Sequence, residues 1–211
     1  MMIRVIVYGA GRGGQLVAEI LDLDSQATVV GFVDDNAGLW QREVAGHPVV
    51  GGGAALEELR RSEYFDALVL SMATPTTMDA RRKLYIDLKA DGFEFINAIH
   101  PAAIISASAH LGENNVISAG AIMGAGARIG SDNRVSAHCN IEHHSVVGSH
   151  NFFSSHCVTG GAVAIGDSCV FGLGCVIESL LHIGNDVLIA SGAVVTEDLA
   201  DGTVIDRGCG G

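Results

Sequence analysis

The sequence predicts an α/β, Rossmann-like domain over residues 1–97, followed by a left-handed parallel β-helix over residues 98–211. Three observations predict this fold class. Strand and helix patterns alternate through the first part, a glycine-rich loop follows the first strand, and apolar residues recur every six positions through the second part. Alternating strands and helices favour a parallel sheet with right-handed crossovers, and a period of six is typical of a parallel β-helix.

The N-terminal elements are predicted from short apolar runs and from helical spacing. Aliphatic and β-branched runs predict strands at residues 3–8, 28–33 and 66–71. Helical spacing predicts helices at residues 15–22, 54–61 and 76–90. The domain is therefore expected to end after about three parallel strands, which is half of a full dinucleotide-binding fold.

The second part contains a column of large apolar residues with a period of six. Neither a plain strand nor a helix has this period, so each hexapeptide is predicted to supply one short strand and one turn, and three of them one coil of about 18 residues. Only Thr159 in the column is not apolar. The column is Ile105, Leu111, Ile117, Met123, Ile129, Val135, Ile141, Val147, Phe153, Thr159, Ile165, Phe171, Ile177, Ile183, Ile189 and Val195.

Small side chains form a second column with a period of 18. The coil geometry predicts that these residues stack at about the ~4.8 Å strand spacing. We interpret the three cysteines among them as a packed ladder, because nothing around them indicates a nucleophile. The column is Ala103, Ala121, Cys139, Cys157, Cys175 and Ala193.

Composition and charge narrow the class of partner. The formal net charge of −12 disfavours nucleic acid and anionic membranes. No apolar stretch approaches the ~20 residues of a membrane span, and the N-terminus lacks the features of a signal peptide. We therefore expect a cytoplasmic protein, whose five cysteines are reduced thiols.

The glycine-rich loop predicts a nucleotide site. Gly9, Gly11 and Gly14 form a G-x-G-x-x-G pattern between a strand and a helix, where glycines let a phosphate approach the backbone. Asp34 and Asp35 end the second strand, where a ribose-binding carboxylate belongs. The half-sized domain suits a single nucleotide better than NAD. The alternative is a tight turn that only packs the helix on the sheet.

Five histidines crowd the middle of the predicted β-helix. Any one of them could be a solvated surface residue, and His138 and His156, 18 residues apart, could simply stack. His143 lies two residues past the core position Ile141, near a turn, where a neutral imidazole could serve as a general base for acyl transfer. Backbone N–H groups of Gly160 and Gly161, one coil further on, could stabilise the oxyanion.

These motifs together resemble the bacterial sugar acyltransferases of the NeuD/PglD type, which include sialic acid O-acetyltransferases and UDP-4-amino-sugar N-acetyltransferases. The resemblance covers nearly the whole chain. It rests on residues 8–11 and 17–19, 32–36, 97–101 and 141–143, and on the hexapeptide column.

The resemblance implies an acetyl-CoA-dependent N-acetyltransferase of a nucleotide-linked amino sugar in surface glycan biosynthesis. It implies a homotrimer with active sites at the subunit seams, acetyl-CoA as co-substrate and no metal. His143 would be the catalytic base, with Glu142 and His144 as its catalytic neighbours. Acetyl-CoA would contact Gly160, Gly161 and Leu173. The nucleotide sugar would contact Gly9, Gly11, Gly13, Gly14, Asp34 and Asp35.

Four features depart from the family pattern. Arg12-Gly13-Gly14 stands where the family commonly has Gly-Gly-His-Gly. His144 takes the place of an acidic residue that orients the catalytic histidine, a role that Glu142 could fill instead. Ser71 begins the segment that usually holds a glycine-containing turn, and the C-terminal Gly-x-Pro-Ala segment is absent from residues 204–211.

Three alternatives remain open from the sequence. The acceptor could be a hydroxyl, as in a sugar or sialic acid O-acetyltransferase. The β-helix could be a metal-dependent lyase of the γ-carbonic-anhydrase type, which binds zinc at a trimer seam, with His138 and His143 as two ligands; the third is expected near Ala102, where it is missing, although His100 and His110 flank that position. The chain could also be a non-catalytic protein that binds nucleotide sugars.

Overall fold

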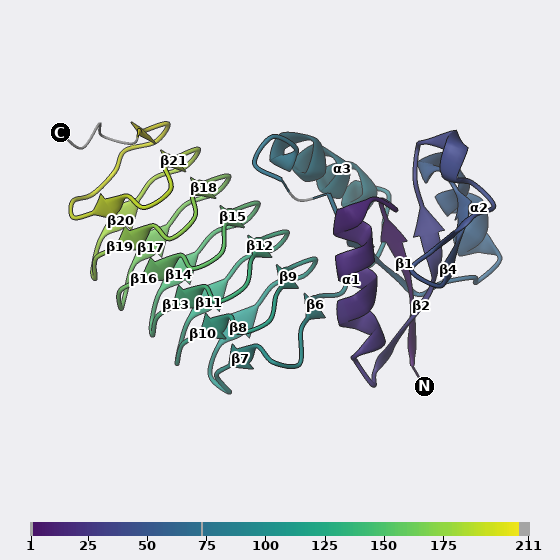
Figure 1. Cartoon of the computed structure of the whole chain (residues 1–211), viewed down its shortest axis with the longest axis horizontal. Helices are drawn as coiled ribbons and strands as arrows, with labels where there is room; N and C mark the ends of the chain where they lie inside the picture. The colour runs from purple at the N-terminus through teal and green to yellow at the C-terminus, as the bar shows by residue number, and fades with distance from the viewer. Residues whose placement is uncertain (1, 73, 207–211) are drawn as a thin grey trace.

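The structure, a computed structural model, describes residues 2–72 and 74–206. An α/β part and a β-helix lie end to end (Figure 1). Residues 207–211, with Cys209 and most of the predicted tail, lie outside the described residues. Among the described residues no helix is both long enough and apolar enough to cross a membrane.

The α/β part is built on a five-stranded sheet in the order β3-β4-β2-β1-β5. Strands β4, β2, β1 and β5 are parallel, and β3 pairs antiparallel with β4. The strands are β1 (Ile3–Tyr8), β2 (Ala27–Val33), β3 (Glu43–Val44), β4 (His47–Gly51) and β5 (Ala67–Leu70). The helices are α1 (Arg12–Asp22), α2 (Leu56–Arg61) and α3 (Met78–Ala90), with 3-10 turns η1 (Ala37–Leu39) and η2 (Gly53–Ala55).

The β3–β4 hairpin corrects the predicted three-stranded order. Its turn residues Ala45 and Gly46 both have positive φ, at 50° and 81°, as in a two-residue hairpin turn. The sequence prediction missed it because Pro48 interrupts a short apolar run and β3 contains only two residues. The helix predicted over residues 54–61 is η2 followed by α2, and α1 begins three residues earlier than predicted, at Arg12.

Helices cover both faces of this sheet. On one face α1 packs Val17 and Ile20 into a core that also contains Ala98 and Val116 from the first coil of the β-helix. On the other face α2 and α3 contribute Leu56 and Leu88 to a second core. The α1 core therefore joins the sheet to the base of the β-helix.

The β-helix confirms the predicted repeat. Its strands form three parallel sheets with neighbours 18 residues apart, as in Ile122 opposite Asn140, until the last coil, which is shorter and pairs Leu188 with Val204. The strands are β6 (Ala98–Ile99), β7 (Ile104–Ile105), β8 (His110–Leu111), β9 (Val116–Ile117), β10 (Ile122–Met123), β11 (Arg128–Ile129), β12 (Arg134–Val135), β13 (Asn140–Ile141), β14 (Val146–Val147), β15 (Phe152–Phe153), β16 (Val158–Thr159), β17 (Ala164–Ile165), β18 (Val170–Phe171), β19 (Val176–Ile177), β20 (His182–Ile183), β21 (Leu188–Ile189), β22 (Val194–Val195) and β23 (Val204–Ile205).

Side chains inside the coil stack as the columns predict. Phe153 and Phe171 stack with ring centroids 4.3 Å apart. Cys139, Cys157 and Cys175 are buried in the same core, which confirms their ladder. The four cysteines in the described part of the chain are free thiols, and burial raises the pKa of Cys169 to about 11.

Most of the clustered histidines occupy one turn position of the repeat. His138, His144, His150 and His156 all have φ between 57° and 63°, a left-handed conformation in which Asn, Asp and His are enriched among non-glycine residues. His138 and His156 stack with centroids 5.2 Å apart, as expected for residues one coil apart. His143 lies outside this column, so the turn geometry does not explain it.

A buried ion pair connects the two parts. Arg81 of α3 is fully buried, and its Nε donates to Oδ1 of Asp132 at 2.7 Å. Its Nη atoms donate to the carbonyls of Leu70, the last residue of β5, of Met72 just after it, and of Asn114 in the coil. Replacing one partner of such a pair leaves an uncompensated buried charge, so the pair holds the end of β5 at a defined place on the β-helix.

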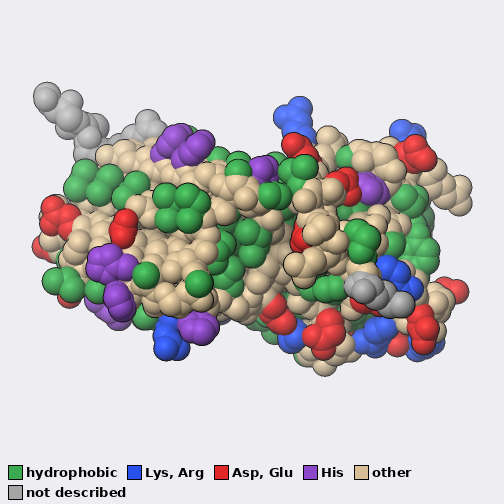
Figure 2. All heavy atoms as spheres, turned by 90° about the horizontal axis from the view of Figure 1, so that it is seen from below, with side chains coloured by type: hydrophobic (Ala, Val, Ile, Leu, Met, Phe, Trp, Pro, Cys, Tyr) green, Lys and Arg blue, Asp and Glu red, His purple; other side chains and the backbone are tan. Residues whose placement is uncertain are grey.

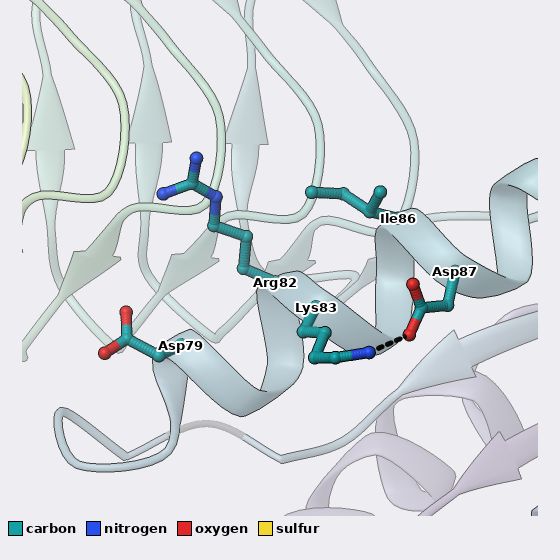
Figure 3. A pocket seen from close by; sticks show the side chains of 5 residues that line it. All are labelled: Asp79, Arg82, Lys83, Ile86 and Asp87. Carbon is teal, nitrogen blue, oxygen red and sulfur yellow. Dashed lines mark hydrogen bonds and ion pairs between the residues drawn. The ribbon is translucent and has the colours of Figure 1, made fainter.

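The outer part of α3 runs beside the coils (Figure 3). Arg82 points toward them and donates to Oγ of Ser168 at 2.9 Å, whereas Lys83 pairs with Asp87 on the helix itself. A shallow hollow of about 320 Å³ lies here, and none of the predicted site residues lines it. We therefore assign this hollow no part in the candidate site.

Candidate functional site

The glycine-rich loop lies between β1 and α1, and three of its glycines are required by packing. A Cβ on Gly9 would lie 2.5 Å from Oγ of Ser71, one on Gly13 2.6 Å from the carbonyl of Ser71, and one on Gly14 2.0 Å from the carbonyl of Gly9. Gly9 also has φ +99°. Gly11 differs, because a Cβ there would meet nothing within 4 Å. The space beside Gly11 is therefore open to a ligand.

The N-terminus of α1 opens into the same space. Gly11 is the N-cap residue without a side-chain cap, and the first turn contains no acidic residue. Within the described part of the chain, no hydrogen bond is present on the backbone N–H groups of Arg12, Gly13 and Gly14. Free N–H groups at a helix N-terminus favour an anion.

A hollow of about 550 Å³ lies over this loop. Asp34 and Asp35 belong to it, as predicted, but both carboxylates also have structural partners. Asp34 accepts the N–H groups of Ala10 and Asn36 at 2.7 and 2.8 Å, and Asp35 accepts the hydroxyl of Tyr8 at 2.9 Å. The hollow is lined by Tyr8, Gly9, Gly11, Arg12, Gly13, Gly14, Leu16, Asp34, Asp35, Ser71, Met72, Thr74, Thr77 and Arg134.

His143 lies directly against Gly161 of the next coil. A Cβ on Gly161 would lie 2.7 Å from Cε1 and 2.8 Å from Nε2 of the imidazole. Nδ1 of His143 lies 3.0 Å from Nδ1 of His144, so one hydrogen bond joins the two rings. His144 thus occupies the place of the acidic partner. When it accepts from His143, Nε2 is the free base.

Glu142 orients the backbone of His143, not its ring. Its carboxylate accepts the N–H of His143 at 3.2 Å and Nδ2 of Asn140 at 2.9 Å, and these two hydrogen bonds hold its pKa below the usual value. Its own N–H donates to Oγ1 of Thr159 at 3.1 Å. Thr159 therefore has a positioning role that the sequence analysis missed, although it was the one polar residue in the apolar column.

The predicted oxyanion donors have partners in this structure. The N–H of Gly160 donates to the carbonyl of Ile177 at 2.7 Å, within the β-helix ladder. The N–H of Gly161 donates to Oγ of Ser179 at 3.1 Å. A hydroxyl can rotate away, whereas the ladder carbonyl is fixed, so Gly161 is the better donor to an oxyanion. Leu173, the third residue predicted to contact acetyl-CoA, is 58% exposed on a turn.

A hollow of about 550 Å³ lies beside Glu142, the residue before His143, and contains residues of three neighbouring strands, although the His143 ring does not line it. It is lined by Asn140, Glu142, Val158, Thr159, Gly160, Val176, Ile177, Glu178 and Ser179. No residue lines both this hollow and the one over the glycine-rich loop. The structure of one chain therefore does not bring the predicted nucleotide-binding residues and His143 into one cavity.

Two buried polar atoms have no hydrogen-bond partner among the described residues. They are Nη1 of Arg134 and Oδ1 of Asn140. Arg134 lines the hollow over the glycine-rich loop, and Asn140 lines the hollow beside Glu142. Buried polar groups are normally paired, so each orphan atom indicates a ligand or a neighbouring chain at its hollow. Sequence analysis missed both residues because their burial depends on the tertiary fold.

Within one chain, the described residues do not assemble a zinc site. In the described ranges, no group of three or more His, Cys, Asp or Glu side chains is placed to hold a metal ion. His138 stacks on His156, and His143 bonds to His144. His138 and His143 therefore have other neighbours than the shared ion that the alternative requires.

Comparisons with known proteins agree with this layout. Residues 4–74 match the family model of the PglD N-terminal domain. A UDP-N-acetylbacillosamine N-acetyltransferase of Bacillus subtilis is 30% identical over 118 residues, which are 56% of this chain and 52% of that protein. The chain thus spans about half the length of this curated relative.

Two groups of solved structures match nearly the whole chain. A histidine-to-alanine mutant of GDP-perosamine N-acetyltransferase from Caulobacter crescentus, in complex with CoA and GDP-perosamine, is 30% identical, with a TM-score of 0.86 over 95% of this chain and 91% of that one. The acetyltransferase domain of PglB from Neisseria gonorrhoeae, in complex with acetyl coenzyme A, is 27% identical, with a TM-score of 0.85. The match covers 97% of this chain and 96% of that one. These matches confirm the predicted left-handed β-helix, and the chain belongs to the bacterial sugar acyltransferase family that joins a PglD-type N-terminal domain to it.

Proposed function

We propose that this protein is an acetyl-CoA-dependent N-acetyltransferase of a nucleotide-linked amino sugar, in surface glycan biosynthesis. The observation that carries the proposal is the His143 imidazole, which lies against Gly161 of the next coil and shares a hydrogen bond with the ring of His144. The relatives support the choice of substrate, since one was solved with CoA and GDP-perosamine and another with acetyl coenzyme A.

His143 is the proposed general base. Nε2 accepts the proton that the sugar amine loses while its nitrogen forms a bond to the thioester carbonyl carbon. The hydroxyl of Ser179 rotates away, and the N–H of Gly161 then donates to the developing oxyanion. When the intermediate collapses, the C–S bond breaks and the proton on His143 is available to the departing thiolate. The products are the N-acetylated sugar and CoA.

A homotrimer completes the proposed site. The hollow that suits a nucleotide and the hollow beside Glu142 are separate within one chain, so a neighbouring copy is needed to bring a nucleotide-linked sugar to His143. The outward face of the sheet that carries β13 supports such contacts. Ile104, Val176 and Val194 on this face are 61%, 38% and 60% exposed. Figure 2 shows hydrophobic side chains in groups over the β-helix half, whereas most charged side chains gather over the α/β half.

The same proposal places the reaction in the cytoplasm. The free cysteines of the described chain suit a reducing compartment, and the net charge of −12 disfavours nucleic acid as a partner. We retain O-acetylation as the second candidate, because a hydroxyl acceptor needs the same base.

Turnover with GDP- and UDP-linked 4-amino sugars tests the proposal. Because His143→Ala lacks the base, its kcat should be lower than that of the wild type by ~10² or more. Its affinity for acetyl-CoA, measured by calorimetry, should be unchanged. His138→Ala is the matched control, because His138 stacks on His156 outside the hollow beside Glu142, and it should keep full activity. Full activity in His143→Ala would refute the assignment of the base. Acetylation of matched 4-hydroxy sugars in place of the amines would establish the second candidate.

A further inference from the structure

Arg134 is a buried arginine without a counter-ion. It is the first residue of β12 and is 8% exposed, and no hydrogen bond or ion pair of its guanidinium is present among the described residues. The first residues of the neighbouring strands in this sheet, Val116 and Phe152, are apolar. A buried charge without a partner is costly, so the arginine is expected to meet an anion that this chain does not supply.

Among the described residues, the one buried carboxylate is that of Asp132, and it already has partners. Oδ1 of Asp132 accepts hydrogen bonds from Nε of Arg81 and from Nδ2 of Asn114. Oδ2 of Asp132 lies 2.8 Å from Nδ1 of His150. Arg81 is thus paired, whereas Arg134 is not. Burial and then the charge of Arg81 lower the pKa of Arg134 to about 10, so the guanidinium remains protonated at neutral pH.

The same hollow contains a second feature that favours an anion. Arg134 and the N-terminal turn of α1 both line it, and the N–H groups of Arg12, Gly13 and Gly14 have no partner in the described chain. The space at Gly11 is open. A guanidinium from the β-helix and a helix N-terminus from the α/β domain therefore share one hollow of about 550 Å³.

We propose that Arg134 binds a phosphate group of the nucleotide, so that the β-helix contributes directly to the nucleotide site. This inference rests on the proposed function and names a substrate-binding residue for it. A guanidinium suits a diphosphate because its planar donors can make two parallel hydrogen bonds to phosphate oxygens. Asp34 and Asp35 of the same hollow then remain for the hydroxyl groups of the ribose.

Calorimetric titration with GDP and UDP tests the inference, with guanosine and uridine as probes without phosphate. In Arg134→Met, the loss of charge-assisted hydrogen bonds should weaken the affinity for the nucleotide that the wild type binds by about 10- to 100-fold. Arg134→Lys should lose less. Affinity for the matching nucleoside and for acetyl-CoA should not change. Arg128→Met is the matched control, because Arg128 is the exposed first residue of the preceding strand, β11, in another sheet.

Thermal unfolding separates ligand binding from a structural role. Because Arg134 is buried without a partner, Arg134→Met should unfold without ligand at the same or a higher Tm than the wild type. A lower Tm together with unchanged GDP and UDP affinity would overturn the inference, as would equal loss of nucleotide and nucleoside.

Inorganic pyrophosphate separates this inference from the proposed function. If pyrophosphate binds in a way that depends on Arg134 but neither GDP nor UDP binds, the anion site is supported and the claim that its ligand is a nucleotide is refuted. A wild type that binds neither nucleotide nor pyrophosphate would overturn the inference even if acetyl-CoA binds. Arg134-dependent GDP or UDP binding without acetyl-CoA binding would instead support the inference and refute the proposed acetyl transfer.

Discussion

Gly161→Ala tests whether the position of the His143 ring controls activity. An added Cβ would lie 2.7 Å from Cε1 of His143, whereas carbon atoms normally pack at about 3.5–4.0 Å. The ring would therefore have to withdraw from residue 161 by roughly 1 Å. Displacements of about 1 Å can lower rates by about 10²-fold, which corresponds to about 2.7 kcal/mol in activation free energy.

The backbone at this place in the repeat tolerates alanine. Ala107 and Ala125 occupy the same hexapeptide position in earlier coils, and Gly161 does not have a positive φ. The Tm of Gly161→Ala should therefore stay within a few degrees of the wild type. The assay is steady-state turnover, with Ala107→Gly, two coils before His143, as the matched control. Gly161→Ala activity within twofold of wild type would refute the reasoning, since it would show that the ring need not rest against Gly161.

Three further predictions follow from the same contacts. His144→Glu should move the acid limb of the pH–rate profile up by about one pH unit, because an adjacent carboxylate favours the protonated imidazole; an unmoved limb would contradict the pairing of the rings. Asn133→Ala should lower the free energy of unfolding in urea by ~2 kcal/mol, because the buried Asn133 amide accepts from Asn151 and donates to Gly148; an unchanged midpoint would contradict this. Val176→Asp, on the exposed sheet face, should shift the mass in sedimentation to that of a monomer if the proposed trimer forms there; an unchanged trimer would exclude this face as the interface.

Much of the β-helix was predictable because its apolar residues recur with a fixed period of six in the sequence. Each apolar residue of the column has one place in the coil, and the register of 18 follows from three hexapeptides. The α/β part was less predictable. The β3–β4 hairpin depends on a two-residue turn at Ala45 and Gly46 and on pairing with β2, and neither gives a periodic signal.

The candidate site was predictable only where a residue type carries its own chemistry. His143 and the glycine-rich loop became candidates in this way. Arg134 was not, because its significance comes from burial beneath the α/β domain and from the prior pairing of Asp132 with Arg81. The role of Glu142 was also beyond the sequence, since its carboxylate turns to the backbone of His143 and leaves His144 beside the ring.

Two polar residues close to His143 interrupt columns of the β-helix that are otherwise apolar. The inward column is apolar except at Thr159, whose hydroxyl holds the backbone of Glu142. The outward face of the sheet that contains β13 is aliphatic except at Asn140, whose amide holds the Glu142 carboxylate. At these two positions the other coils have apolar side chains, which pack there at lower cost, so folding alone does not require Thr159 or Asn140. Both exceptions converge on the residue before His143, which argues that this coil was selected for the orientation of that histidine and not for stability alone.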